Sequence, residues 1–298
     1  MSSDTNSSSE EEIEPTEEEK VEVLKFVGSL EYHEECFDCN QRHGDKRTLD
    51  TLRPIDCVNG IITTACGSVS LKMGNTALIC AAKAELAEPL VEAPDCGAVY
   101  VGIEAMNPEV LSNSTAIEEA KLILQDLIVP CVISQQSLCI SKDLLCWVIY
   151  VDISILNNDG GLTDACLMAM IATLKQVCLP MVEAKNSDEV LSLKNIRIKS
   201  EDRRPLQLNT LYPIASTFLL HEDKVVCDPT LDELNLFHCK MTIVVGANDV
   251  ICGLFKLGGR GTVEPITLSR CIALAIKRRT EILTTLNVVD SSDELDSE

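Results

Sequence analysis

The sequence predicts an α+β fold made of two related, strand-rich halves, each with packed helices. The chain has 298 residues, of which 46% are hydrophobic, so it can form one large domain or two smaller ones. Apolar runs of strand length recur in both halves of the chain, and each set is followed by an apolar segment with helical spacing. This repeated order indicates an internal duplication.

Acidic residues concentrate at the two ends of the chain. The formal net charge is −22, and residues 1–20 carry eight acids and one base, while residues 290–298 carry five acids and no base. Segments this acidic and this poor in apolar residues favour disorder, so we expect disordered acidic tails at residues 1–20 and 287–298. The remaining body has no long basic stripe, which predicts a poor independent nucleic-acid binder.

The composition also indicates the compartment. No apolar run reaches the roughly 18 residues that span a bilayer, and the N-terminus lacks the basic and apolar regions of a signal peptide. The 15 cysteines are scattered singly through apolar segments, a pattern typical of small buried side chains in a reducing compartment. We therefore expect a protein of the cytosol or nucleus.

The first part of the chain predicts an N-terminal helix with its connection over residues 21–48 and the first half of the main fold over residues 49–195. Spacing and alternation predict the elements as follows: a helix within 21–39, a hairpin over 67–86 that turns at Gly74-Asn75, a helix over 116–129, a buried strand over 143–156 and a helix from Asp164 to about Val177.

A polar stretch over residues 185–204 is the best candidate for a linker, and the second half follows over residues 205–286. The expected elements there are strands within 212–230 and 240–257, a glycine turn at 258–261 and a helix over 266–286.

Four residues near the N-terminus have side chains of the zinc-binding type. His33, Cys36, Cys39 and His43 fall within eleven residues. Zinc knuckles usually place a longer loop between their ligand pairs, and these pairs lie in a predicted helix and its end. Free thiols beside solvated histidines are therefore favoured over a metal site.

The sequence spacing of the residues that can act as acids or bases does not identify a catalytic set. The histidines other than His33 and His43 are His221 and His238, and no nucleophile–histidine–acid arrangement can be chosen from them. Asp228, Asp232 and Glu233 in CDPTLDELN can serve as acid–base or metal-binding groups, but an ordinary turn is the favoured interpretation.

The stretch NNDGGLTDA, which joins the buried strand to the next helix, is a candidate phosphate-binding turn. A glycine pair before a helix exposes N–H groups that attract anions. The loop continues with Leu162, Thr163 and Asp164, however, and supplies no cation. Asp164 is expected to cap the helix and would repel an anion, so Gly160 and Gly161 are predicted to form a structural corner.

Several segments, taken together, resemble the RNase PH-like subunits of the eukaryotic RNA exosome over roughly residues 48 to 285. They are GSVSLKMGNTALICAAKAELAEP, APDCG, LCISKDLLCWVIYVDISILNNDGGLTDACLMAMIATLKQVCLP, VVCDPTLDELNLFHCKMTIVV and KLGGRG. The resemblance implies an RNase PH-like fold, in which two halves pack back to back. It also implies a ring of six such subunits through which RNA threads.

Residues that the family uses for catalysis differ in this chain. Active members follow their Gly-Gly with Thr or Ser and then a phosphate-binding Arg, whereas Leu162 and Thr163 stand here. Active members also carry two aspartates six residues apart, and Leu234 and Lys240 occupy those positions. Asp228 matches an acid outside that pair.

Two further motifs of the family are also altered. The usual Arg-Pro-Asp-Gly-Arg reads Arg42, His43, Gly44, Asp45 and Lys46, and the loop that carries an RNA-contacting arginine reads VGIEAMNPEVLSNS, without a basic residue.

The resemblance and these departures predict a non-catalytic structural subunit of the exosome core ring, with no cofactor and no metal. Its expected partners are other RNase PH-like subunits in a hetero-hexameric ring, RNA-binding cap subunits and RNA in the shared channel, with no membrane. The expected locations are the nucleus, including the nucleolus, and the cytoplasm. The alternatives are an active phosphate-dependent 3′→5′ exoribonuclease and a small zinc-bearing adaptor.

Overall fold

The computed structural model describes residues 29–42, 44–107, 114–184, 196–209, 212–257, 259 and 262–286. The predicted acidic tails, the glycine turn at 258–261 except Gly259, and His43 lie outside these residues. The chain divides into two compact units, Met1–Leu49 and Asp50–Glu298.

Helix α2 (Ser29–Asp38) is the element described in the first unit. It agrees with the helix predicted within residues 21–39, in the part of that segment that the structure describes. The helix buries His33 and Phe37, whose rings meet edge to face. After it, Arg42 is buried and donates a hydrogen bond to the Leu49 carbonyl.

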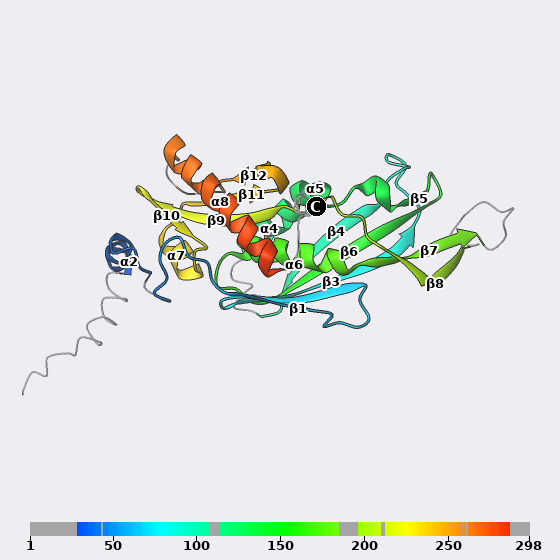
Figure 1. Cartoon of the computed structure of the whole chain (residues 1–298), viewed down its shortest axis with the longest axis horizontal. Helices are drawn as coiled ribbons and strands as arrows, with labels where there is room; N and C mark the ends of the chain where they lie inside the picture. The colour runs from blue at the N-terminus through cyan, green and yellow to red at the C-terminus, as the bar shows by residue number, and fades with distance from the viewer. Residues whose placement is uncertain are drawn as a thin grey trace, which may run out of the picture. The chain divides into compact units, whose positions relative to one another are not determined.

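A six-stranded sheet forms the first half of the second unit (Figure 1). Its order is β1-β2-β3-β6-β4, with β5 paired to β6, and only β4 runs parallel to its partner β6. The strands are β1 (Ile55–Asn59), β2 (Gly67–Met73), β3 (Thr76–Ala87), β4 (Ala98–Ala105), β5 (Cys139–Ser141) and β6 (Leu145–Asn157). The predicted hairpin and buried strand are thereby confirmed.

Helix α6 (Leu162–Gln176) packs on β2 and β3 and also contacts β9 (Ile214–His221) of the second half. The helix buries its own side chains on almost every side, as expected for a helix that lies between layers. The approach to β2 is close, because a Cβ on Gly67 would lie 2.7 Å from the Thr173 carbonyl oxygen. The helix predicted from Asp164 is confirmed, although it begins two residues earlier.

The helix predicted over residues 116–129 is interrupted. Helix α4 (Ser114–Leu122) continues as a π-helical segment (Ile123–Ile128) and then as α5 (Val129–Val132). In the π segment the Val129 N–H donates to the Leu124 carbonyl, five residues back. Pro130 follows at once and has no N–H with which to continue a regular ladder.

A four-stranded antiparallel sheet of order β10-β9-β11-β12 and the long helix α8 (Pro265–Thr285) form the second half. Pro265 stands at the start of α8, where its missing N–H costs nothing. The strands and short helix are β9 (Ile214–His221), β10 (Lys224–Cys227), α7 (Leu231–Leu236), β11 (Lys240–Val245) and β12 (Ile251–Phe255), with a short 3-10 turn at Ala247–Asp249.

The stretch over residues 185–204, predicted to be a linker, contains a paired strand in the part that the structure describes. Strands β7 (Cys178–Ala184) and β8 (Ile196–Pro205) pair into an antiparallel ribbon. The described residues of β8 from Arg197 onward are exposed. A ribbon that buries so little needs few apolar residues, so its sequence has the polar composition of a linker.

The two halves share one core. Ile214, Val244 and Ile282 from the second half belong to the same buried cluster as Leu78 and Ile153 of the main sheet. A smaller cluster lies between the second sheet and α8. No helix in the described part of the chain has the length and apolarity needed to cross a membrane.

Candidate functional site at the glycine turn

The turn between β6 and α6 requires both of its glycines. Gly160 has φ +85° and Gly161 has φ +63°, the left-handed region that L side chains disfavour. A Cβ on Gly160 would lie 2.4 Å from the Pro229 carbonyl oxygen, and one on Gly161 would lie 2.7 Å from the Met73 side chain. The geometry agrees with the predicted corner.

Polar side chains of the protein already form hydrogen bonds with part of the backbone of this turn. The Thr76 hydroxyl accepts a hydrogen bond from the Asp159 N–H at 3.0 Å and donates one to the Gly160 carbonyl at 2.8 Å. The Gly160 N–H donates to the Asn158 side-chain oxygen at 3.1 Å. Two N–H groups at the start of the turn are therefore engaged within the chain.

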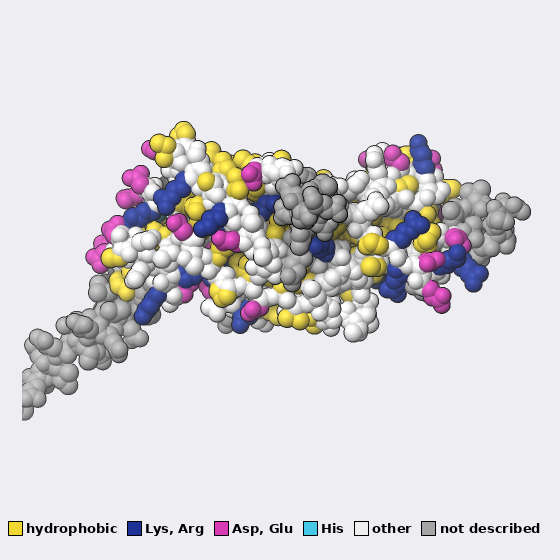
Figure 2. Space-filling model, in the orientation of Figure 1, with side chains coloured by type: hydrophobic (Ala, Val, Ile, Leu, Met, Phe, Trp, Pro, Cys, Tyr) yellow, Lys and Arg dark blue, Asp and Glu magenta, His cyan; other side chains and the backbone are white. Residues whose placement is uncertain are grey.

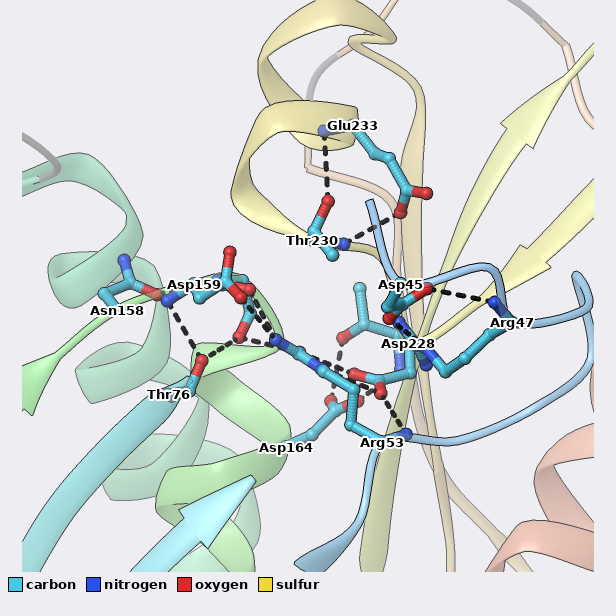
Figure 3. Close-up of polar contacts among 12 residues, drawn as sticks. Asp45, Arg47, Arg53, Thr76, Asn158, Asp159, Asp164, Asp228, Thr230 and Glu233 are labelled. Carbon is cyan, nitrogen blue, oxygen red and sulfur yellow. Dashed lines mark hydrogen bonds and ion pairs between the residues drawn. The ribbon is translucent and has the colours of Figure 1, made fainter. Parts of the chain in front are cut away.

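Arg53 lies at the centre of the site, between the turn and Asp228 (Figure 3). Its Nε and Nη2 donate to the two carboxylate oxygens of Asp228 at 3.0 and 2.7 Å, and its backbone N–H donates to the same carboxylate at 2.9 Å. Nη2 also donates to the Gly160 carbonyl at 3.1 Å, and Nη1 donates to the Asp159 carbonyl. One guanidinium thus joins the turn to the end of β10.

Burial and pairing act in opposite directions on Arg53 and Asp228. Their side chains are 4% and 0% exposed, and burial alone raises the pKa of the Asp228 carboxyl, but the hydrogen bonds and charge of Arg53 outweigh it. The pKa of Asp228 is therefore lowered. Burial likewise disfavours the charged guanidinium, yet the hydrogen bond and charge of Asp228 raise the pKa of Arg53.

The prediction that Asp164 caps α6 is wrong. Gly161 occupies the cap position and no side chain accepts a hydrogen bond there, while Asp164 lies in the first turn with its side chain fully buried. Its carboxylate accepts hydrogen bonds from the Thr217 N–H and hydroxyl, both at 2.7 Å, and Arg278 Nη2 is 3.9 Å away. Burial raises the pKa of Asp164 more than Arg278 and Thr217 lower it. The residue joins α6 to β9 rather than capping its own helix.

The two buried carboxyls predict opposite pH dependences of stability. The lowered pKa of Asp228 gives a stabilising contribution that is present above the unfolded value of about 3.9 and is lost as the pH falls through the folded pKa. The raised pKa of Asp164 gives a contribution that is complete below about 3.9 and is lost as the pH rises through the folded pKa.

Asp164→Asn is therefore expected to remove the pH dependence of stability that the Asp164 carboxyl contributes. As the pH is lowered from neutral toward about 4, the wild-type free energy of unfolding should rise relative to that of the variant. Urea unfolding at a series of pH values measures this difference. The exposed Asp232→Asn variant is the control, and a pH-independent difference between wild type and Asp164→Asn would contradict the assignment.

A small cavity of about 50 Å³ collects the four positions that the sequence singled out. Leu162 and Thr163 from the start of α6, Leu234 from α7 and Lys240 from the start of β11 all line it. A neighbouring cavity of about 290 Å³ shares Leu234 and Lys240. The positions expected to be catalytic in relatives thus lie together beside the glycine turn, and here they carry two leucines, a threonine and a lysine.

Lys240 does not present a free charge to this cavity. Its ammonium group forms an ion pair with Glu119 of α4, and both side chains are about a quarter exposed. Glu119 lines both cavities too. The pair neutralises the Lys240 charge and ties α4 to the second sheet.

The acids after Asp228 do not join the site. Asp232 is exposed, while Glu233 and Thr230 form a capping box at the start of α7, each side chain binding the other's backbone N–H. Asp228 itself has φ +52° at the end of β10. The segment leads into helix α7 instead of forming only a turn, and the turn interpretation also missed the buried ion pair of Asp228.

The residues singled out near the N-terminus lie in the first unit. His33 Nδ1 contacts the Ser29 carbonyl oxygen at 2.6 Å, and Cys39 is exposed. Among the described residues no group of three or more potential ligands converges on a metal position. Arg42 holds the Leu49 carbonyl, and Asp45 pairs with Arg47.

Sequence reasoning missed Arg53, Thr76 and Glu119. Arg53 stands alone before a proline, and its partner Asp228 is 175 residues further along the chain. The available signal was an aspartate directly after an apolar strand, since a buried acid needs a cation. Glu119 lies on the polar side of a predicted amphipathic helix, where nothing distinguishes it from solvent-exposed neighbours.

Known proteins match most of the second unit. Models of the 3′ exoribonuclease family match residues 51–180 as domain 1 and residues 212–278 as domain 2. An exosome complex component rrp43 from Schizosaccharomyces pombe is 32% identical, over 78% of this chain and 85% of its own length. An exosome complex component Rrp42 from Methanopyrus kandleri is 28% identical, over 81% and 90%.

Solved structures agree on the fold. An archaeal exosome core subunit matches with a TM-score of 0.71 and 22% identity, over 89% of this chain and 99% of its own. A chain of the Archaeoglobus fulgidus exosome with RNA bound to the active site has the same TM-score and identity, over 87% and 99%. With both domain models matched and a relative above 30% identity, the chain belongs to the 3′ exoribonuclease (RNase PH) family, and it has that family's two-domain fold.

Proposed function

We propose that this chain is a non-catalytic structural subunit of the core ring of an RNA exosome, where it supports 3′→5′ RNA processing and degradation by scaffolding the ring and forming part of the RNA channel. The observation that carries the proposal is the ion pair of Lys240 with Glu119 in the cavity beside the glycine turn, where Leu234 stands in place of an acid. Phosphorolysis needs a positioned phosphate and a group that manages charge on the leaving oxygen. This cavity supplies neither.

The proposed partners are other RNase PH-like subunits in a hetero-hexameric ring, RNA-binding cap subunits and RNA in the shared channel. The relatives named as exosome complex components support this assignment.

Strand β12 ends the second sheet, and its Ile251 and Leu254 are each 44% exposed. Figure 2 shows hydrophobic side chains in this region of the surface. An apolar sheet edge of this kind is typical of surfaces that bind a neighbouring subunit. The proposed locations are the nucleus, with the nucleolus, and the cytoplasm.

Two measurements, on two preparations of the chain, test the proposal. The tagged chain, isolated from its own cells, is expected to bring with it other RNase PH-like proteins, identified by mass spectrometry. Recombinant chain, incubated with RNA, inorganic phosphate and magnesium, is expected to release no nucleoside diphosphates.

The alternative is an active phosphate-dependent exoribonuclease. Diphosphate release that disappears in the Lys240→Ala variant would establish it and overturn the non-catalytic assignment. Purification of the tagged chain without any other member of the family would overturn the scaffolding role.

A further inference from the structure

The main sheet turns one face to the core and exposes side chains on the other. On the core side, Leu78 of β3, Val151 of β6 and Val101 of β4 belong to the buried cluster. The alternate residues point away from it, because successive side chains of a strand lie on opposite faces. Nine of them, which we call the tyrosine face, come from these three adjacent strands (Figure 1): Ile79, Ala81 and Lys83 of β3, Tyr150, Asp152 and Ser154 of β6, and Tyr100, Gly102 and Glu104 of β4.

Two tyrosines stand side by side on the tyrosine face. The strand register aligns Tyr100 with Tyr150, and their rings stack with a centroid distance of 5.6 Å and an interplanar angle of 23°. The side chains nevertheless remain 46% and 37% exposed. Aromatic rings that keep this much surface open to solvent are typical of the residues on which a binding partner packs.

A carboxylate lies directly beside the tyrosine pair. Asp152 is in the next row of the sheet, opposite Gly102, and a Cβ added to Gly102 would lie 2.9 Å from Asp152 Oδ1. The absent side chain of the glycine therefore leaves room for the carboxylate. Glu104 follows one row further along β4. Both acids are exposed, and neither side chain forms an ion pair or a hydrogen bond with a described residue.

The charge of the tyrosine face is negative. Lys83 is the one cation among its nine residues, and its ammonium group is already paired with Glu85 of the same strand. The hydrogen bond and charge of Glu85 raise the pKa of Lys83, and the charge of Asp152 adds a smaller contribution in the same direction. Asp152 and Glu104 are left without a paired cation, on a chain whose formal net charge is −22.

This combination of exposed rings and unpaired carboxylates selects among partners. RNA is disfavoured, because the carboxylates repel its phosphates. An entirely apolar protein surface is disfavoured too, because it would bury the carboxylates without partners. An arginine side chain suits both features, since its planar guanidinium stacks on aromatic rings and donates two parallel hydrogen bonds to a carboxylate.

We propose that the tyrosine face binds an arginine-bearing segment of another protein. The guanidinium stacks on an exposed tyrosine ring and donates hydrogen bonds to the Asp152 carboxylate. A second arginine, two residues along an extended segment, reaches Glu104, because two residues of an extended chain span about the same distance as one row of the sheet, roughly 6.6 Å. The inference goes beyond the proposed function, since it does not depend on which assembly the chain joins.

The test titrates the full-length chain, carrying isotope-labelled tyrosine rings, with the synthetic peptide acetyl-Gly-Arg-Gly-Arg-Gly-amide. The chain has four tyrosines, so its ring signals in NMR spectra are few, and Tyr100→Phe and Tyr150→Phe assign the two of interest. The signals of Tyr100 and Tyr150 are expected to shift and to saturate. Those of Tyr32 and Tyr212, which lie outside the tyrosine face, should stay in place.

Three variants locate the contact. Asp152→Asn removes the charge that the guanidinium pairs with, and it should weaken binding by about tenfold. Lys83→Met removes the competing cation and should tighten binding by about two- to fivefold. Asp223→Asn, at an exposed acid in the turn between β9 and β10, is the control and should leave binding unchanged.

Two further probes distinguish the partner chemistry. The matched peptide with lysine in place of arginine is expected to bind about tenfold more weakly, because an ammonium group does not stack on a ring and bond to a carboxylate at once. A uridine oligonucleotide should not move the signals. The proposal is overturned if the arginine peptide moves neither signal, if the two peptides bind equally, if Asp152→Asn binds like the wild type, or if the oligonucleotide shifts the two rings.

Discussion

Asp228→Asn is expected to lower the free energy of unfolding by about 3–5 kcal/mol. The substitution leaves the shape of the side chain almost unchanged but removes the negative charge that faces the buried Arg53 guanidinium. Arg53 then stays 4% exposed with its main counter-charge gone, while the partly exposed Asp159 carboxylate is 3.5 Å away and compensates only in part. Urea or thermal unfolding of the purified chain measures the loss.

Asp164→Asn is the matched control, because Asp164 is equally buried and lies in the same region. Its carboxylate accepts hydrogen bonds from Thr217, and Arg278 is 3.9 Å away. An Asn side chain can keep part of the hydrogen bonding to Thr217. The substitution also does not remove the partner of a closely paired cation. The expected cost is about 1 kcal/mol. Lys199→Met, at a surface ion pair with Glu183, should change stability within error. Equal losses for Asp228→Asn and Asp164→Asn would contradict the central role of the Arg53 pair.

Most of the fold could be predicted from the sequence because its elements have clear periodicity. The hairpin over residues 67–86, the buried strand over 143–156 and helix α6 are apolar in patterns that only one kind of element satisfies. Strand β8 could not be predicted, because its described residues from Arg197 onward are exposed and it therefore needs no apolar face.

The site was less predictable, because the local sequence pattern does not identify which distant residue a side chain will contact in the folded protein. Asp164 follows two glycines at the start of a helix, and its sequence context suits a cap as well as a buried link to β9. The cavity positions Leu162, Thr163, Leu234 and Lys240 were found through family resemblance, and the structure then placed them together. The Glu119 carboxylate that neutralises Lys240 appears only once α4 and β11 are adjacent.

Gly160→Ala is expected to destabilise the protein by about 3 kcal/mol or more, through two separate effects. The φ of +85° is unfavourable for any L side chain and costs about 1 kcal/mol. The added Cβ would also lie 2.4 Å from the Pro229 carbonyl oxygen and 2.8 Å from the Thr230 carbonyl carbon. Both contacts are backbone atoms, so relief requires the segment before α7 to move away from the turn.

Gly60→Ala separates the two effects, because Gly60 has φ +74° but no atom within 4 Å of an added Cβ. The loss of stability in Gly60→Ala should be limited to the cost of the unfavourable backbone conformation, about 1 kcal/mol. Gly161→Ala should fall between them, since its nearest contact, at 2.7 Å, is the flexible end of the Met73 side chain. Chemical denaturation of the three variants gives the order directly. If Gly160→Ala costs no more than Gly60→Ala, the glycine turn is not packed against residues 229–231, and it cannot be the corner that holds Leu162 and Leu234 beside one cavity.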